Sequence, residues 1–177
     1  MILEKACEYK VDIHQLYIYY KQAYDTINRV ELVEITKEFE IPMKLVRLVR
    51  MTLTNINSKV KIQGKPSPSF ETTIGLRQGH SLSTLLFNLC MEKIIRNVRI
   101  GPDGTIFNRT KQCLAYEDDV VILRRTEGYI KRTLEEMAAI AQQRGLQMND
   151  TKTKYMINRQ DGNKVKEIEL MGKRYEK

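Results

Sequence analysis

Two adjacent carboxylates, Asp118 and Asp119, are the residues in this sequence whose type and spacing best suit the binding of a metal ion. Apolar runs flank them, Cys113-Leu114 before the pair and Val120–Leu123 after it. Such runs predict two β-strands joined by a tight turn, in which aspartate oxygens stay free to bind Mg²⁺. The pair therefore suggests a metal site. A solvated hairpin turn explains the same residues, so the rest of the chain must decide between the two interpretations.

The segments that precede the acidic pair predict a strand followed by two helices. His14–Tyr20 is rich in aromatic and β-branched residues, which is typical of a strand. Asn28 can cap a helix whose apolar residues recur at helical spacing up to Phe39. Pro42, at a first-turn position, opens a second helix that runs through Leu45, Leu48 and Val49.

A β-hairpin and a longer helix are predicted next. Asn57–Gln63 alternates apolar with polar residues, as a half-exposed strand would, and a turn around Gly64–Pro66 leads back into Phe70–Ile74. Ser81 or Ser83 can then cap a helix from about Leu82 to Val98.

The segments after the acidic pair predict one more helix and two short strands. Glu127–Arg144 has apolar residues at helical intervals, and Gly145 is a plausible stop. Gln147–Asn158 and Ile168–Leu170 are strand-like. This order of elements predicts an α+β fold, with helices on one face of an antiparallel sheet and an inner part like a split βαβ, ferredoxin-like core.

Composition limits the classes of protein to which the chain can belong. With 177 residues, 42% hydrophobic and 29% charged, the chain suits one globular domain and not a disordered protein. The three cysteines form no Cys-x-x-Cys, so we expect reduced thiols and an intracellular location, in the cytoplasm or the nucleus. We find neither a signal peptide nor an apolar segment of about 20 residues, and so expect a soluble protein without a membrane partner.

The charge of the chain favours a polyanionic partner. Its 30 Lys and Arg residues exceed its 22 Asp and Glu residues, which gives a formal net charge of +8. Such a balance is typical of proteins that bind nucleic acid. Because the excess is spread along the chain, an ordinary solvated surface explains it equally well.

Four segments, taken in order, resemble the motif set of reverse transcriptases from non-LTR, LINE-type retrotransposons. They are Tyr20–Asp25, Gly75–Asn88, Tyr116–Asp119 and Gly145–Thr153. The resemblance covers nearly the whole chain, and its strength lies in the joint order and spacing of the segments. It implies one domain over residues 1–177, composed of a polymerase palm and part of the fingers and lacking a thumb.

The resemblance also implies an activity and the residues that perform it. In RNA-directed DNA polymerases, two Mg²⁺ ions activate the primer hydroxyl and stabilise the departing pyrophosphate. Asp118 and Asp119 resemble part of that metal site, for Mg²⁺ or for Mn²⁺ in its place, provided that the site still assembles. Lys152 matches the lysine proposed to meet the triphosphate, although a lone lysine on a strand is more often a solvated charge. The implied partners are an RNA template, an RNA–DNA duplex and a dNTP, with protein partners left open.

Three further residues match the nucleotide pocket of the family. Tyr24 would lie beneath the incoming sugar, and a core aromatic is its structural alternative. Gln78 and Gly79 precede a predicted helix N-terminus, where free backbone N–H groups approach a nucleotide. Ordinary helix capping would explain the Gly as well.

The first motif departs from the family pattern at a position that matters for catalysis. The family has an aspartate where this chain has Tyr19, and a phenol is a neutral, poor Mg²⁺ ligand at pH 7. Glu117 replaces a small or apolar residue and adds a third negative charge beside the pair. We therefore expect a polymerase by descent with impaired catalysis. A non-catalytic nucleic-acid-binding module and an inactive retroelement remnant are the alternatives.

Overall fold

The computed structural model describes residues 2–98, 113–158, 167–170 and 172–176. The chain divides into two compact units, each with its own packing. The first unit combines both ends of the sequence, residues 1–21 and 91–177, and the second comprises residues 22–90. No described helix is long and apolar enough to cross a membrane.

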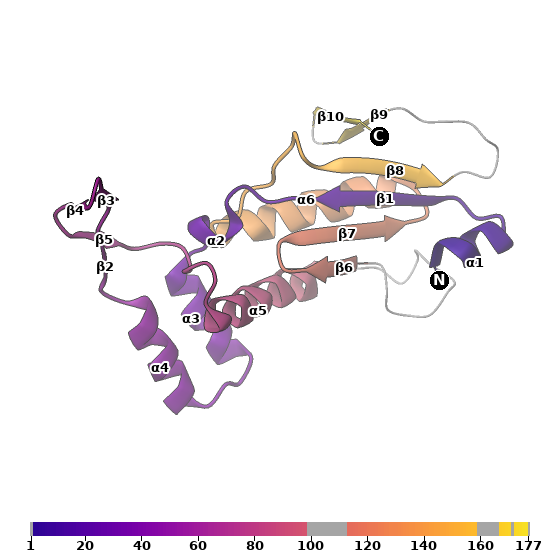
Figure 1. The fold of residues 1–177 in the computed structure, drawn as a ribbon. Coiled ribbons are helices and arrows are strands. Elements are labelled where there is room, and N and C mark those ends of the chain that lie inside the picture. The colour runs from indigo at the N-terminus through magenta and orange to yellow at the C-terminus, as the bar shows by residue number, and fades with distance from the viewer. Residues whose placement is uncertain (1, 99–112, 159–166, 171, 177) are drawn as a thin grey trace. The chain divides into compact units, whose positions relative to one another are not determined.

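A four-stranded antiparallel sheet dominates the first unit, in the order β6-β7-β1-β8 (Figure 1). The elements of this unit are α1 (Ile2–Glu8), β1 (Ile13–Ile18), β6 (Cys113–Tyr116), β7 (Asp119–Arg124), α6 (Glu127–Gln143), β8 (Lys154–Asn158), β9 (Glu167–Leu170) and β10 (Lys173–Glu176). A further helix, α5 (Ser81–Asn97), begins in the second unit and ends in the first. The mixture of helices with an antiparallel sheet confirms the predicted α+β class.

Helix α6 covers one face of this sheet. Its residues Ile130, Leu134 and Met137 are fully buried, and it packs against β1 and β7. On β7, Arg124 donates from Nε to the Thr133 hydroxyl of α6 over 3.3 Å, so the Arg124 side of the strand is the side that α6 covers. Side chains alternate across a strand, so the odd-numbered residues of β7 lie on the opposite face.

The ends of α6 follow from local sequence. Thr126 caps its start by accepting a hydrogen bond from the Tyr129 N–H over 3.5 Å. At the other end Gly145 has φ +84°, and the Leu146 and Gly145 N–H groups donate to the carbonyls of Ala141 and Gln142. This paired pattern is a Schellman motif, which confirms Gly145 as the stop.

The second unit contains helices and two small hairpins. Its elements are α2 (Ala23–Thr26), α3 (Arg29–Glu38), α4 (Met43–Leu53), β2 (Ile56–Ser58), β3 (Lys61–Ile62), β4 (Lys65–Pro66) and β5 (Phe70–Thr72). Asn28 caps α3 as predicted, because its side chain accepts from the Val30 and Glu31 N–H groups at 2.9 and 3.3 Å. Strand β2 pairs with β5 and β3 pairs with β4, which confirms a hairpin in this region.

Several local details differ from the sequence-based expectations. Helix α4 begins at Met43, so Pro42 is its N-cap residue and not a residue of its first turn. The helix buries Val46 and Leu53, and Leu45 and Leu48 are about half exposed, at 49% and 51%. Helix α5 already begins at Ser81, and the group that accepts from its Leu82 N–H is the His80 ring, not a serine. The strand predicted to be half exposed carries exposed side chains throughout Lys59–Gln63.

Candidate functional site

The acidic pair lies at the turn of the β6–β7 hairpin. Tyr116 and Asp119 form the last pair of this ladder, which leaves Glu117 and Asp118 as a two-residue turn. Glu117 has φ +51°, a left-handed conformation that is unfavourable for a residue with a side chain of this kind. Asp118 is half buried and Asp119 is exposed, so both carboxylates can reach solvent ions. This geometry confirms the predicted pair of strands with a tight turn.

Tyr19 directly follows strand β1, next to the strand that carries Asp119. Pairs between β1 and β7 run from His14↔Arg124 to Ile18↔Val120 and end there. If this register continued by one residue, Tyr19 would stand opposite Asp119. Asp119 itself lies on the face of the sheet opposite to the Arg124 side that α6 covers, because side chains alternate along a strand.

The segment after α6 holds the backbone of Tyr19 in place. The Asn149 N–H donates to the Tyr19 carbonyl over 2.7 Å, and the Tyr19 N–H donates to the Thr153 hydroxyl over 3.5 Å. Thr153 is buried, and its hydroxyl donates to the Asn149 carbonyl over 2.8 Å. Sequence reasoning assigned no role to Asn149 or Thr153. Their position inside the fourth motif was the one signal that pointed to them.

Lys152 does not lie on a strand, contrary to the sequence-based expectation. It occupies the turn before β8, where its N–H donates to the Asn149 backbone carbonyl and side-chain oxygen at 3.2 Å each. Its side chain is exposed. The turn belongs to the segment whose residues Asn149 and Thr153 bond to the backbone of Tyr19. Tyr19, the acidic hairpin and Lys152 all lie in the first unit.

The three residues expected to contact a nucleotide lie in the second unit. Tyr24 is half buried and stacks on Phe87, with ring centroids 4.6 Å apart and an interplanar angle of 14°. Gln78 is exposed, and its Nε2 donates to the Asp25 side chain over 3.4 Å. Gly79 has φ +77°, and a Cβ there would meet no atom within 4 Å. The backbone at Gly79 is therefore open to close approach by a ligand.

A buried arginine fixes the loop that carries Gln78 and Gly79. Arg29 donates from Nε to the Gly75 carbonyl over 2.6 Å and from its terminal nitrogen to the Thr72 carbonyl. Burial lowers the pKa of this guanidinium from its usual value. Gly75 itself has φ +82°, and an added Cβ would lie 2.6 Å from the Asp25 carbonyl oxygen. No spacing or motif in the sequence indicated this role for Arg29.

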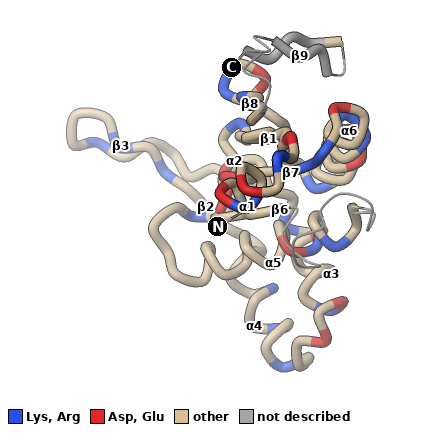
Figure 2. Tube along the Cα trace, turned by 90° about the vertical axis from the view of Figure 1, so that its right-hand side faces the viewer, with Lys and Arg blue, Asp and Glu red and all other residues tan. Residues whose placement is uncertain are grey.

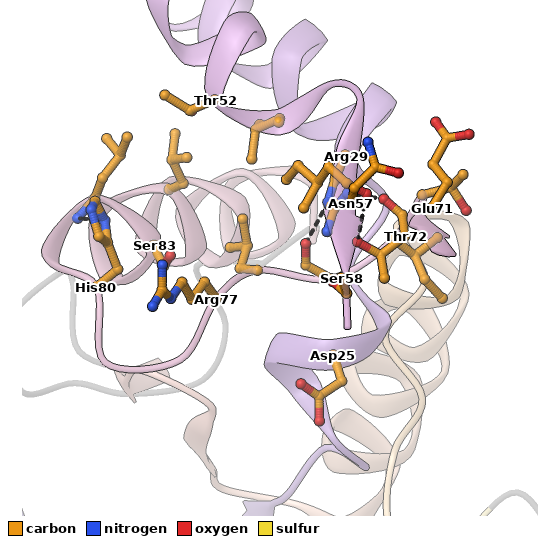
Figure 3. A pocket seen from close by; sticks show the side chains of 18 of the residues that line it. Asp25, Arg29, Thr52, Asn57, Ser58, Glu71, Thr72, Arg77, His80 and Ser83 are labelled. Carbon is orange, nitrogen blue, oxygen red and sulfur yellow. Dashed lines mark hydrogen bonds between the residues drawn. The ribbon is translucent and has the colours of Figure 1, made fainter. Parts of the chain in front are cut away.

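An open pocket of about 1000 Å³ adjoins this loop within the second unit. Figure 3 shows Arg29 close to Asn57 of β2 and Thr72 of β5, with Asp25 on the neighbouring helix. Arg77 and His80 also line the pocket, which gives it both cationic and hydroxyl-bearing walls. The two arginines and the hydroxyl groups suit a polar or anionic ligand.

The acids present do not complete a metal site. Among the described residues, no three His, Cys, Asp or Glu side chains gather in a way that could hold a metal ion. Asp118 and Asp119 provide hard oxygen ligands, but the residue that follows strand β1 is Tyr19, whose phenol is a poor ligand for such an ion. The residues therefore fit a divalent ion incompletely.

Comparison with known proteins decides the family of the chain. Residues 7–174 match the family model for reverse transcriptase (RNA-dependent DNA polymerase). The chain belongs to the reverse transcriptase family. Polymerases of this family generally use divalent metal ions.

The curated relatives of this reverse transcriptase domain are retrotransposon polyproteins. It is 25% identical over 131 residues to the Pol polyprotein of a type-1 retrotransposable element R2 from Nasonia vitripennis, a match that covers 72% of this chain and 12% of that protein. It is 24% identical over 131 residues to the Pol polyprotein of the type-2 element R2DM from Drosophila melanogaster, which covers 74% and 12%. The chain thus spans a small part of the length of these relatives.

Solved telomerase structures share the fold of this reverse transcriptase domain. Apo telomerase from Candida tropicalis, truncated from its C-terminal domain, matches with a TM-score of 0.69 and 15% identity, over 99% of this chain and 36% of that chain. Telomerase from the same organism in complex with a fragment of telomeric RNA matches with a TM-score of 0.69 and 14% identity, over 92% and 28%. At this level of identity the likeness concerns the fold.

Proposed function

We propose that this chain is the palm and part of the fingers of an RNA-directed DNA polymerase whose catalysis is impaired. The observation that carries the proposal is the register between β1 and β7, whose last pair is Ile18↔Val120, so that its continuation by one residue would set Tyr19 opposite Asp119. The family has an aspartate at that position. Its carboxylate would complete a set of three acids around a metal ion, and the phenol leaves the set at two.

Each of the two units carries its own set of proposed roles. In the first unit, Asp118 and Asp119 hold residual Mg²⁺ or Mn²⁺, and Lys152 faces the phosphates of the dNTP. In the second unit, Tyr24, Gln78 and Gly79 line the nucleotide pocket. The open backbone at Gly79 and the stacked ring of Tyr24 support these two roles. The substrates are an RNA template, an RNA–DNA duplex and a dNTP, and the three free thiols favour work inside the cell, in the cytoplasm or nucleus.

The expected loss of rate has a physical cause. A carboxylate at position 19 would help Asp118 and Asp119 to hold the divalent ions, which would supply activation of the primer hydroxyl, so without it we expect these ions to bind weakly. Removing one preorganised electrostatic group typically costs about 100-fold to 1000-fold in rate. Glu117 does not replace the missing ligand, because its turn conformation sets it beside Asp118 and not on strand β1.

Primer extension tests the proposal. The test uses a chimera in which residues 7–174 of this chain replace the matching segment of an active reverse transcriptase. The active enzyme then supplies the remaining parts of the polymerase. We expect little synthesis with Tyr19, and synthesis raised by at least about 100-fold with Tyr19→Asp and Glu117→Ala together. Tyr19→Asn is the matched control, since it removes the ring without supplying a charge. Equal synthesis by the parent and the Tyr19→Asp variant would refute impairment.

A second candidate function is that of a non-catalytic nucleic-acid-binding module. The net charge of +8 favours it. This function predicts salt-dependent binding of RNA that does not change when Mg²⁺ is removed by EDTA. Binding that requires Mg²⁺ would favour the polymerase instead.

A further inference from the structure

Arg29 is a buried arginine whose charge no acid balances. Its side chain is 9% exposed, and in the described part of the chain it forms no ion pair. Several exposed cations do have such partners, as in Lys131 with Glu127 at 3.1 Å on α6, where Figure 2 shows Asp and Glu, in red, beside Lys and Arg, in blue. A charge inside a protein is unfavourable unless hydrogen bonds compensate for the lost water.

The place of Arg29 on α3 makes its charge less favourable still. Arg29 is the first residue of this helix, directly after the N-cap residue Asn28. The N-terminal end of a helix carries a partial positive charge, so it favours acids and disfavours cations. The stability of α3 therefore does not explain an arginine at this position. The explanation lies in the contacts that Arg29 makes beyond the helix.

Those contacts join two backbone carbonyls. The Nε atom of Arg29 donates to the Gly75 carbonyl over 2.6 Å, and a terminal nitrogen donates to the Thr72 carbonyl. Thr72 ends β5, and Gly75 begins the segment that carries Gln78 and Gly79. Because the guanidinium is planar and its N–H groups point in fixed directions, one side chain fixes the two carbonyls relative to each other.

The same loop is bonded to the segment that carries Tyr24. The Gly75 N–H donates to the Ile27 carbonyl over 2.9 Å, and the Leu76 N–H donates to the Tyr24 carbonyl over 2.6 Å. Arg29 and Gly75 line the open pocket of the second unit (Figure 3). Arg29 therefore holds one side of a loop whose other side is bonded to the backbone of Tyr24.

This arrangement favours a role in positioning over direct contact with a ligand, because Arg29 is buried and two of its three guanidinium nitrogens bond to carbonyls. We propose that Arg29 is a positioning residue that holds the loop of residues 75–79 against Tyr24 and so determines how strictly the nucleotide pocket selects a sugar. The inference rests on the proposed function, since it takes Tyr24 to lie beneath the sugar. A ring in that place excludes a 2′ hydroxyl by steric contact only while its backbone is held.

Nucleotide selection tests the proposal, in the primer-extension chimera that carries Tyr19→Asp and Glu117→Ala. The measured quantity is the ratio of kcat/KM for a dNTP to kcat/KM for the matching rNTP, which does not depend on the fraction of enzyme that is folded. Arg29→Met keeps the length of the side chain and removes its donors, so we expect it to lower this ratio by at least about 10-fold. Arg29→Lys keeps the charge without the planar pair of donors and should lower the ratio to a smaller extent.

Arg144→Met is the matched control. Arg144 is also a buried arginine that donates to a backbone carbonyl, that of Ile140 over 2.9 Å, but it lies in the first unit. It should leave the ratio unchanged. A parent ratio in Arg29→Met, full recovery by Arg29→Lys or an equal loss in Arg144→Met would each overturn the role of Arg29 alone. A chimera with Arg29 intact that adds no nucleotide would refute the proposed function and, with it, the role of Arg29.

Amide hydrogen exchange of the chain itself tests the hold on the loop without any polymerase activity. The Gly75 and Leu76 N–H groups should exchange at least about 10-fold faster in Arg29→Met than in the parent, when both are compared with the amides of α6. Arg144→Met should leave this comparison as in the parent. Equal protection of Gly75 and Leu76 in the parent and Arg29→Met would overturn the proposal.

Discussion

At the scale of single residues, Tyr19 and Gly75 show how local chemistry decides what the molecule can do. Tyr19 is well held, since Asn149 and Thr153 both bond to its backbone, yet its side chain cannot act as a metal-binding acid. The backbone at position 19 is therefore held by contacts that do not depend on which side chain stands there. Gly75 shows the opposite case, a position where the backbone accepts no side chain at all.

Gly75→Ala should destabilise the protein strongly. The new Cβ would lie 2.6 Å from the Asp25 carbonyl oxygen, and φ +82° is unfavourable for alanine. We expect the free energy of unfolding to fall by at least about 2 kcal/mol, measured by urea denaturation. Gly128→Ala is the control, because Gly128 is helical with no atom within 4 Å of a built Cβ, and it should raise stability by about 0.5 kcal/mol. Equal effects of the two substitutions would contradict this account of Gly75.

At the scale of elements, the β6–β7 hairpin combines an unfavourable turn with a partly buried thiol. Glu117 holds a left-handed conformation at the turn, and Cys113 on β6 is half-buried, whereas the other residues of β6 are exposed. The hairpin therefore presents its two aspartates at some cost in stability. Each of these features can be tested separately.

Glu117→Asn should stabilise the hairpin. Asparagine tolerates the left-handed region better than glutamate, so the substitution should raise the free energy of unfolding by about 0.5–1 kcal/mol. Glu117→Gln removes the same charge without easing the backbone and serves as the control. Thermal unfolding followed by circular dichroism compares the two. If Gln stabilises as much as Asn, charge repulsion and not backbone conformation is the cause.

Cys113 should resist alkylation and make the protein sensitive to alkali. Burial raises the pKa of its thiol to about 11. Iodoacetamide at about pH 8 should therefore label the exposed Cys7 and leave Cys113 unmodified. Between pH 9.0, the ordinary pKa of a thiol, and about pH 11, the Cys113 thiol ionises in the unfolded chain but not in the folded one. Stability should thus fall by about 2 kcal/mol across this range.

The control for this pH dependence is Cys7→Ala, which removes an exposed thiol and should keep the loss of stability. Cys113→Ala should abolish the additional loss. The measurement is the free energy of unfolding in urea at each pH. A parallel pH profile for the parent and Cys113→Ala would contradict a raised pKa.

Elements with strong local signals were predictable from the sequence, and features that depend on distant contacts were not. Asn28 and Gly145 mark the start of α3 and the end of α6 through interactions with their own neighbours. The sequence did not predict which face of α4 is buried, because apolar residues surround much of this helix and tertiary packing selects Val46 and Leu53 among them. The Arg29 bonds to Thr72 and Gly75 join residues more than 40 positions apart, so no short pattern could reveal them.

The acidic site was predictable in part for the same reason. The turn that carries Asp118 and Asp119 follows from the two apolar runs beside it, and the structure confirms it. The pairing of β1 with β7 and the bonds from Asn149 and Thr153 to Tyr19 depend on three separate segments. The roles of Tyr24, Gln78, Gly79 and Lys152 stay predictions.

At the scale of the whole molecule, the chain keeps the fold of its family, and its acidic pair and its excess of positive charge lie in different parts of the sequence. The sheet that bears the acidic pair is formed by both ends of the sequence, and the second unit, residues 22–90, is inserted between them. That second unit contains residues 41–70, which include six of the 30 Lys and Arg residues and none of the 22 Asp and Glu residues. This cluster of positive charge and the acidic pair therefore lie in different units.

Calorimetric titration with Mn²⁺ tests the central claim most directly, because it measures the metal site without requiring a complete polymerase. The parent chain should bind weakly, Tyr19→Asp should bind at least about 10-fold more tightly, and Tyr19→Asn should match the parent. Adding Asp119→Asn to Tyr19→Asp should remove the gain. If the parent binds Mn²⁺ as tightly as Tyr19→Asp does, the metal site is complete without a carboxylate at position 19, and the account of impaired catalysis is wrong.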